Sequence, residues 1–288
     1  MEFFSQLTIN SLIAAAIYAL MALGFNLIFA TTRFFNLAHG IYAAVGGYAT
    51  LFFVKTLEMS LYVGILLGIV VAGGIGYLSN LVVYAPLKKR KASNMVLLVA
   101  SLGVFALLQA TIAMLFTSQF HTLSDALTSR EGIEIGGGVI TSVQLAMIFA
   151  AVLIMTALAL VLKHTKFGKA VRAVSDDEEV AKIVGINTER ITTRVFFVGG
   201  SIAGLAGILI SFDTGIDPTI GMGLLLKGVI ASIIGGVGNV YGSVLGALIL
   251  GFAENFGIWN IAGEWKDAIA FGVLILFLIF RPKGILGK

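Results

Sequence analysis

Residues 7–29, LTINSLIAAAIYALMALGFNLIF, form an apolar run without a charged side chain. A helix of about 20 apolar residues can cross the hydrocarbon core of a bilayer. Similar runs follow at 34–54, 61–84, 94–118, 141–162, 195–212, 223–239, 241–260 and 267–280. Because a backbone in lipid must satisfy its own polar groups, each run is expected to be helical. The sequence thus predicts an all-α fold, a single membrane domain over residues 1–288 with about eight or nine transmembrane helices.

The composition excludes an ordinary soluble domain. Hydrophobic residues make up 58% of the chain and charged residues only 12%, whereas soluble domains carry about 25% charged residues. The chain has no cysteine, which excludes disulfides, iron–sulfur clusters and thiol chemistry. The net charge of +4 comes from basic residues in short loops between apolar runs. We therefore expect contact with membrane lipid and none with nucleic acid.

The distribution of positive charge predicts the orientation in the membrane. Most Lys and Arg residues lie in three segments, at 88–91, 163–194 and 281–288. Loops rich in Lys and Arg face the cytoplasm. Counting the apolar runs between these segments gives nine spans, with the N-terminus outside and the C-terminus in the cytoplasm.

Two parts of the chain repeat one pattern in opposite orientations. Residues 17–54 contain an apolar helix, a polar break at 31–40 and a second helix rich in small residues, and residues 195–236 do the same around a break at 213–222. We interpret the two parts as an inverted repeat with interrupted helices, which is typical of transporters. Small residues spaced by four along several runs predict close helix packing.

The first polar break gathers the candidates for a translocation pathway. Asn26, Asn36 and His39 are polar residues inside or beside apolar runs, where polar groups are costly and mark functional sites. An interrupted helix also exposes backbone groups that can hold a zwitterion. The alternative for His39 is a neutral side chain that bonds the bent backbone. Phe35 would line an apolar path, or else pack against protein or lipid.

Two charged residues also fall within apolar runs. Glu254 lies within about two helical turns of the outer end of its run, and we expect its carboxylate to extend to the interface. Lys227 lies near the outer end of its helix, where Asp213 or Asp217 could pair with it.

The longest polar segment, 163–194, is expected to be a cytoplasmic loop with a short helix at about 176–184. Ser175 and Glu178 have the spacing of a capping box, acidic residues in the first turn suit the helix dipole, and Gly185 suits the end of the helix. Such a helix is either a docking surface for a soluble partner or an ordinary solvated loop.

The chain resembles the permeases of branched-chain amino acid ABC importers, LivH type, over nearly its whole length. The resemblance rests on five stretches in the expected order: GFNLI at 24–28, TRFFNLAHG at 32–40, GKAVRA at 168–173 with its following helix, GGVGNVYGSVLG at 235–246 and FRPKGILG at 280–287. It implies a type II-like importer permease in the plasma (inner) membrane of a prokaryote. It also implies that the loop couples ATP hydrolysis to transport, through Gly168, Lys169, Ala170, Arg172, Ala173, Asp176, Asp177, Glu178, Ala181 and Gly185.

The resemblance implies several partners, which the chain itself cannot replace. These are a LivM-type second permease, two cytosolic ABC ATPases and an extracytoplasmic solute-binding protein. The sequence contains no phosphate-binding loop, since Lys169 is followed by Ala170 rather than Ser or Thr. We therefore expect no enzyme activity and no bound cofactor, with ATP and Mg²⁺ held by the partner ATPases. Metal-ligand spacings are also absent from the sequence.

The residues leave three functions open. The first is an ATP-driven importer of branched-chain or other hydrophobic amino acids, with urea and short amides as alternative solutes. The second is a secondary transporter driven by an ion gradient. The third is a membrane subunit that does not conduct.

Overall fold

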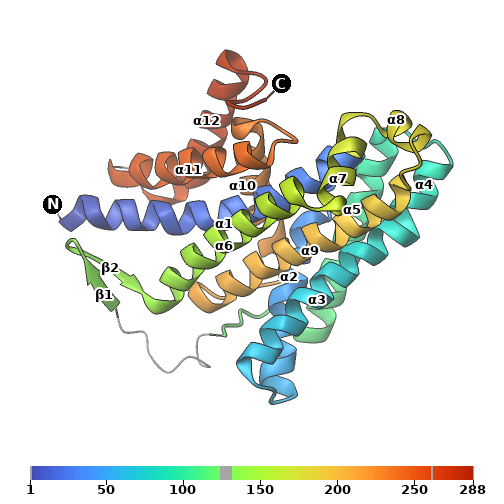
Figure 1. Ribbon diagram of the computed structural model, residues 1–288. Helices are drawn as coiled ribbons and strands as arrows, with labels where there is room; N and C mark the ends of the chain where they lie inside the picture. The colour runs from blue at the N-terminus through green and yellow to red at the C-terminus, as the bar shows by residue number, and fades with distance from the viewer. Residues whose placement is uncertain (1, 124–131, 261, 288) are drawn as a thin grey trace.

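The computed structural model describes residues 2–123, 132–260 and 262–287 and is almost entirely helical (Figure 1). The helices are α1 (Glu2–Thr32), α2 (His39–Leu51), α3 (Leu61–Ser79), α4 (Ala85–Lys89), α5 (Asn94–Phe116), α6 (Ser142–His164), α7 (Lys166–Asp176), α8 (Glu178–Ile183), α9 (Thr188–Asp213), α10 (Ile220–Gly235), α11 (Val240–Gly257) and α12 (Lys266–Phe280). Two π-helical turns, η1 (Phe52–Thr56) and η2 (Asn80–Tyr84), extend α2 and join α3 to α4. Short 3-10 turns at Ile258–Asn260 and Gly263–Trp265 precede α12.

Each of the nine predicted apolar runs contains a helix. Within the described residues, six helices are long and apolar enough to cross a membrane: Glu2–Thr32, Leu61–Lys89, Asn94–Phe116, Ser142–His164, Thr188–Asp213 and Val240–Gly257. The helices α2, α10 and α12 are shorter, and the short α10 agrees with the glycine-rich seventh run. The prediction of a polytopic all-α membrane protein is confirmed.

The helices α1 and α9 form the centre of the bundle. In their apolar windows 78% and 72% of the residues are buried, against 17–28% in α3, α5 and α6. Glycine makes this density possible, because backbones can touch only where no side chain intervenes. A methyl group on Gly46 of α2 would lie 2.5 Å from the Cα of Gly204 of α9, and one on Gly207 would overlap the carbonyl of Ala43.

The two units that the sequence pairs as an inverted repeat pack against each other at glycines. Gly24 of α1 lies against Gly199 of α9, and Gly40 of α2 against Gly221 of α10. Arg33, directly after the end of α1, and Thr188, the first residue of α9, both bond the segment formed by α7 and α8, so the two central helices run in opposite directions. The breaks lie at 33–38 and 214–219, inside the predicted ranges.

A β-hairpin precedes α6 and was not expected from the sequence. Strands β1 (Gly132–Ile135) and β2 (Gly138–Thr141) pair antiparallel around two glycines with positive φ. The hairpin is fixed to the start of α1, since the Gln6 side chain accepts from the backbone N–H of Val139 at 2.8 Å and donates to its carbonyl at 3.1 Å. The hairpin and the N-terminus therefore lie at one end of the molecule (Figure 1).

The expectations for Glu254 and Lys227 were wrong. Glu254 is fully buried, pairs with Lys227 and accepts a hydrogen bond of 2.7 Å from the Tyr18 hydroxyl. Lys227 also pairs with Asp267 at 2.8 Å, rather than with Asp213 or Asp217. The packing of α10 and α11 places Lys227 beside the Glu254 carboxylate. A buried charge is tolerated when it is paired, so the Glu254 carboxylate stays inside the protein and does not extend to the interface.

We expect Gly207→Ala to destabilise the bundle, because its Cβ would overlap the backbone of Ala43. Overpacking of this kind costs about 1–3 kcal/mol. The matched control is Gly103→Ala in α5, where the added carbon meets no atom within 4 Å. Thermal unfolding of the purified variants should show a lower midpoint for Gly207→Ala alone, and equal midpoints would contradict the close packing.

Candidate functional site

The segment 163–194 forms two short helices, of which α7 lies flat against the bundle. Gly168, Val171 and Val174 are buried, whereas Lys169, Arg172 and Asp176 are exposed on the opposite side. A methyl group on Gly168 would overlap the end of α6 at Val161 and Leu162, so this glycine permits the sharp corner between α6 and α7. The predicted loop residues Ala170 and Ala173 are half-buried.

The predicted start of the second helix was wrong. Ser175 belongs to α7, and Asp177 is the N-cap of α8, with its carboxylate accepting from the N–H groups of Glu179 and Val180 at 2.8 and 3.0 Å. Asp177 has extended backbone angles, which is the usual N-cap conformation. The segment therefore bends at Asp177.

The predicted end of α8 is confirmed. Gly185 has a φ of +85°, donates to the carbonyl of Lys182 and is followed by Ile186, which donates to the carbonyl of the buried Ala181; both distances are 3.0 Å. This pair of bonds is the Schellman motif. It fixes the direction in which the chain leaves α8 toward α9.

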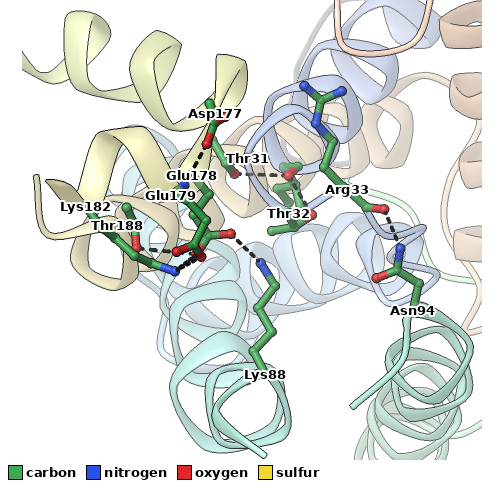
Figure 2. A network of polar contacts seen from close by, with 11 residues as sticks. Thr31, Thr32, Arg33, Lys88, Asn94, Asp177, Glu178, Glu179, Lys182 and Thr188 are labelled. Carbon is green, nitrogen blue, oxygen red and sulfur yellow. Dashed lines mark hydrogen bonds and ion pairs between the residues drawn. The ribbon is translucent and has the colours of Figure 1, made fainter. Parts of the chain in front are cut away.

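Glu178 connects α8 to two neighbouring elements (Figure 2). Its carboxylate pairs with Lys88 of α4 at 3.5 Å and with Lys182 at 3.2 Å, and accepts from Thr188 of α9 at 3.4 Å. Partial burial alone raises the pKa of the Glu178 carboxyl, but the charges of Lys88 and Lys182 and their hydrogen bonds lower it further than burial raises it. The carboxyl therefore has a pKa below its ordinary value, and the contact to α4 is an ion pair.

Arg33 connects the same segment to the polar break. It directly follows α1 with a left-handed φ of +58°, which is uncommon for a residue other than glycine. Its guanidinium donates to the carbonyl of Ser175 near the end of α7. Its own carbonyl accepts from the Asn94 side chain at 3.3 Å (Figure 2). A cation beside the last carbonyls of a helix is favoured by the helix dipole.

An exposed apolar tip forms the outer side of α8. Val180, Ile183 and Val184 are 54%, 83% and 68% exposed, while Glu179 and Lys182 flank them. Sequence reasoning missed this tip, because it selected the charged residues of the loop. The sequence feature that could have revealed the tip is the presence of three large apolar residues close together on a short polar segment.

Asn36 and His39 shape the break at 33–38. The Asn36 Oδ1 accepts from the N–H of Ala38 and from the Tyr84 hydroxyl, both at 3.1 Å. His39 Nε2 lies 3.2 Å from the carbonyl of Met21 in α1. Both side chains are buried, so in this conformation they support the backbone. A contact with a solute stays a prediction.

The other two pathway candidates are Asn26, within α1, and Phe35, in the break after it. Asn26 is buried and bonds the turn between α10 and α11, where its Oδ1 accepts from Gly238 at 2.9 Å and its Nδ2 donates to the Ser243 hydroxyl at 2.5 Å. Phe35 is half-buried and its ring packs near those of Phe25 and Phe29, at centroid distances of 5.6 and 5.2 Å.

The π-turn η2 explains how the membrane helix α3 reaches this break. It turns Tyr84 inward onto Asn36 and Asn80 inward onto Thr193 of α9, with 2.9 Å between the two side chains. Turns of this kind inside long helices are frequent at functional sites. Among the described residues, no group of three or more acidic residues and histidines could hold a metal ion.

Known proteins of similar sequence are components of transport systems. The family model described as branched-chain amino acid transport system, permease component, matches residues 7–278. The chain is 30% identical to the high-affinity branched-chain amino acid transport system permease protein BraD of Pseudomonas aeruginosa, over 98% of this chain and 95% of that protein. It is 28% identical to a probable branched-chain amino acid transport permease protein LivH of Methanocaldococcus jannaschii, over 96% and 91%.

A solved structure has the same fold. PsaBC from Streptococcus pneumoniae, in complex with Fab, superposes with a TM-score of 0.54 at 15% identity, over 95% of this chain and 91% of that chain. At this identity the likeness concerns the fold alone. The family model and the near full-length relatives establish the wider relationship: the chain belongs to the family of permease components of branched-chain amino acid transport systems.

Proposed function

We propose that this chain imports branched-chain or other hydrophobic amino acids into the cytoplasm as one permease subunit of an ABC importer. The names of the relatives BraD and LivH support the solute class. The observation that carries the ATP-driven mechanism is the exposed apolar tip of α8, because exposed apolar groups rimmed by polar residues mark contact sites for proteins.

The proposed assembly contains a second, LivM-type permease, two cytosolic ATPases and an extracytoplasmic binding protein. Membership in a family of transport-system components supports these partners. ATP and Mg²⁺ are bound by the ATPases, and this chain performs no chemical step. The basic segments at 88–91 and 163–194 face the ATPases in the cytoplasm, as the positive-inside rule requires.

The proposed coupling proceeds from α8 to the break at 33–38 along two routes. In the first, α8 moves with the ATPase, and the end of α7 moves Arg33 through the carbonyl of Ser175. In the second, Glu178 moves Lys88 and thereby α4 and η2, whose Tyr84 bonds Asn36. Both routes end at the break formed by residues 33–38. A shift of α8 therefore changes the backbone that directly precedes α2.

The break is also the proposed gate of the pathway. Phe35, half-buried beside Phe25 and Phe29, is the residue proposed to contact an apolar solute side chain. Asn26, Asn36 and His39 hold the surrounding backbone and face the solute when the gate opens. The buried Glu254 already has Lys227 as its partner, so it does not offer a free carboxylate for a coupling ion.

We expect Ile183→Asp to release the ATPases. In the proposed complex the ATPase buries the Ile183 side chain. Losing the burial of one isoleucine costs about 1.5–3 kcal/mol, which weakens binding roughly tenfold or more. Co-purification from a tagged chain should recover the second permease but much less ATPase. The matched control is Ile133→Asp on the hairpin, which is exposed at the opposite end of the molecule. Full ATPase recovery with Ile183→Asp would refute docking at α8.

Arg33→Gly tests the first coupling route. Glycine accepts the left-handed backbone of Arg33, so the variant removes the guanidinium and keeps the turn. A hydrogen bond to a charged group contributes roughly 1.5–3 kcal/mol, and its loss should raise the number of ATP molecules hydrolysed per solute transported. The control is Glu58→Gly, because Glu58 is exposed, also has a left-handed φ, of +51°, and lies outside the segments proposed to face the ATPases. An unchanged ratio in an intact complex would exclude this route.

The orientation can be tested at the two ends of one continuous helix, Leu61–Lys89. The chain has no cysteine, so Ser60→Cys and Arg90→Cys each supply a single thiol. A membrane-impermeant maleimide should label Ser60→Cys in intact cells, and Arg90→Cys only after permeabilisation. The reverse result would invert the proposed orientation.

A further inference from the structure

A groove runs along α9 between α3 and α6. Figure 1 shows α9 lying between these two helices. The groove consists of three adjoining chambers of about 360, 630 and 340 Å³. The first two share Phe167, Phe197 and Val198, and the last two share Tyr77 and Arg194. The chambers are therefore continuous from the middle of α9 to its first turn.

The two larger chambers are apolar. Side chains from α3, α6, α7 and α9 line them, and Leu205 marks the deep end on α9. Gly74 of α3 lines the middle chamber, and a methyl group on it would meet no atom within 4 Å. The groove is thus open at this glycine, and a larger side chain would enter it without displacing protein.

The third chamber is polar and positively charged. Arg190 and Arg194 of α9 line it and are exposed, and within the described residues no carboxylate pairs with either guanidinium. Glu189 also lines the chamber, but its carboxylate pairs with Lys89 at 2.8 Å. Two guanidinium groups are consequently available to an anion at this end of the apolar groove.

The length of the apolar part matches one leaflet. Leu205 and Arg194 are separated by eleven positions on α9, which corresponds to roughly 16 Å at 1.5 Å per residue. One leaflet contributes half of a hydrocarbon core about 30 Å thick. A molecule with its charge at Arg194 and an acyl chain along α9 would reach Leu205 near the middle of the bilayer.

We propose that this groove is a binding site for an anionic phospholipid of the leaflet on the side of α7 and α8. The phosphate group binds Arg190 and Arg194, and one acyl chain lies between α3 and α6 over Gly74. Charge complementarity selects the anionic headgroup, and the apolar lining selects the chain. The site does not depend on which solute the protein carries.

The lipid would also contact α7, the first helix of the segment proposed to couple ATP hydrolysis to transport. Phe167 of α7 lines both apolar chambers, so an acyl chain in the groove packs against the start of α7. Loss of the lipid would leave this ring without one of its neighbours. The lipid is thereby a structural ligand that supports the position of α7 against the bundle.

The test is lipid retention by the chain purified together with its partners. The complex is equilibrated with a mixture of phosphatidylglycerol and phosphatidylcholine of equal chain length, and bound lipid is counted by native mass spectrometry. The variants are Arg194→Gln, Gly74→Leu, and the controls Arg90→Gln and Gly103→Leu. Gly103 lies on α5, where added atoms also meet open space.

Both lipids carry a phosphate, but phosphatidylcholine also carries a trimethylammonium cation that the two guanidinium groups repel. We therefore expect the unaltered complex to retain phosphatidylglycerol about tenfold more strongly than phosphatidylcholine. Arg194→Gln should weaken this preference, because only Arg190 remains at the headgroup, and Gly74→Leu should reduce the retention of both lipids. Equal retention of the two lipids, or variants that behave like the controls, would overturn the proposal. A second measurement places a photo-reactive amino acid at position 74 in the assembled complex. A cross-link from it to a partner protein rather than to lipid would also overturn the proposal.

Discussion

The fold depends on one constraint: a backbone that leaves the helical conformation inside a membrane must find partners for its N–H and C=O groups within the protein. Two breaks, at 33–38 and 214–219, interrupt the central helices. In the first, the Ser101 hydroxyl accepts from Leu37 at 3.0 Å and Asn36 accepts from Ala38. In the second, Ile216 forms a two-way bridge with His121, at 2.7 and 2.9 Å.

The same constraint explains where polar side chains occur in an apolar bundle. Asn26 and Asn36 each bond a non-helical stretch of backbone, and His39 bonds the carbonyl of Met21. Glycine has the complementary role at helix crossings such as Gly46 and Gly204, where backbones meet without side chains. Each of the two units therefore combines a close helix crossing with a bonded break, and the segment formed by α7 and α8 contacts the first break through Arg33.

The sequence predicted the features that arise from local patterns. Apolar runs located the helices, polar interruptions located both breaks, and Gly185 located the end of α8. It did not predict the pairing of Lys227 with Glu254 or the docking of the hairpin on Gln6, because these contacts join distant parts of the chain. The N-cap of α8 was misplaced because Ser175 and Asp177 both suit that role, and only the bend after α7 decides between them.

The central claim is that ATP hydrolysis on partner subunits drives solute uptake through this chain. The most direct measurement is uptake of labelled leucine into vesicles that contain the purified assembly, with ATP and Mg²⁺ on the ATPase side and an ionophore present. The account predicts uptake that requires ATP, persists with the ionophore and is not competed by urea. Uptake that needs no ATP and stops when the ionophore is added would identify a gradient-driven carrier and contradict the account.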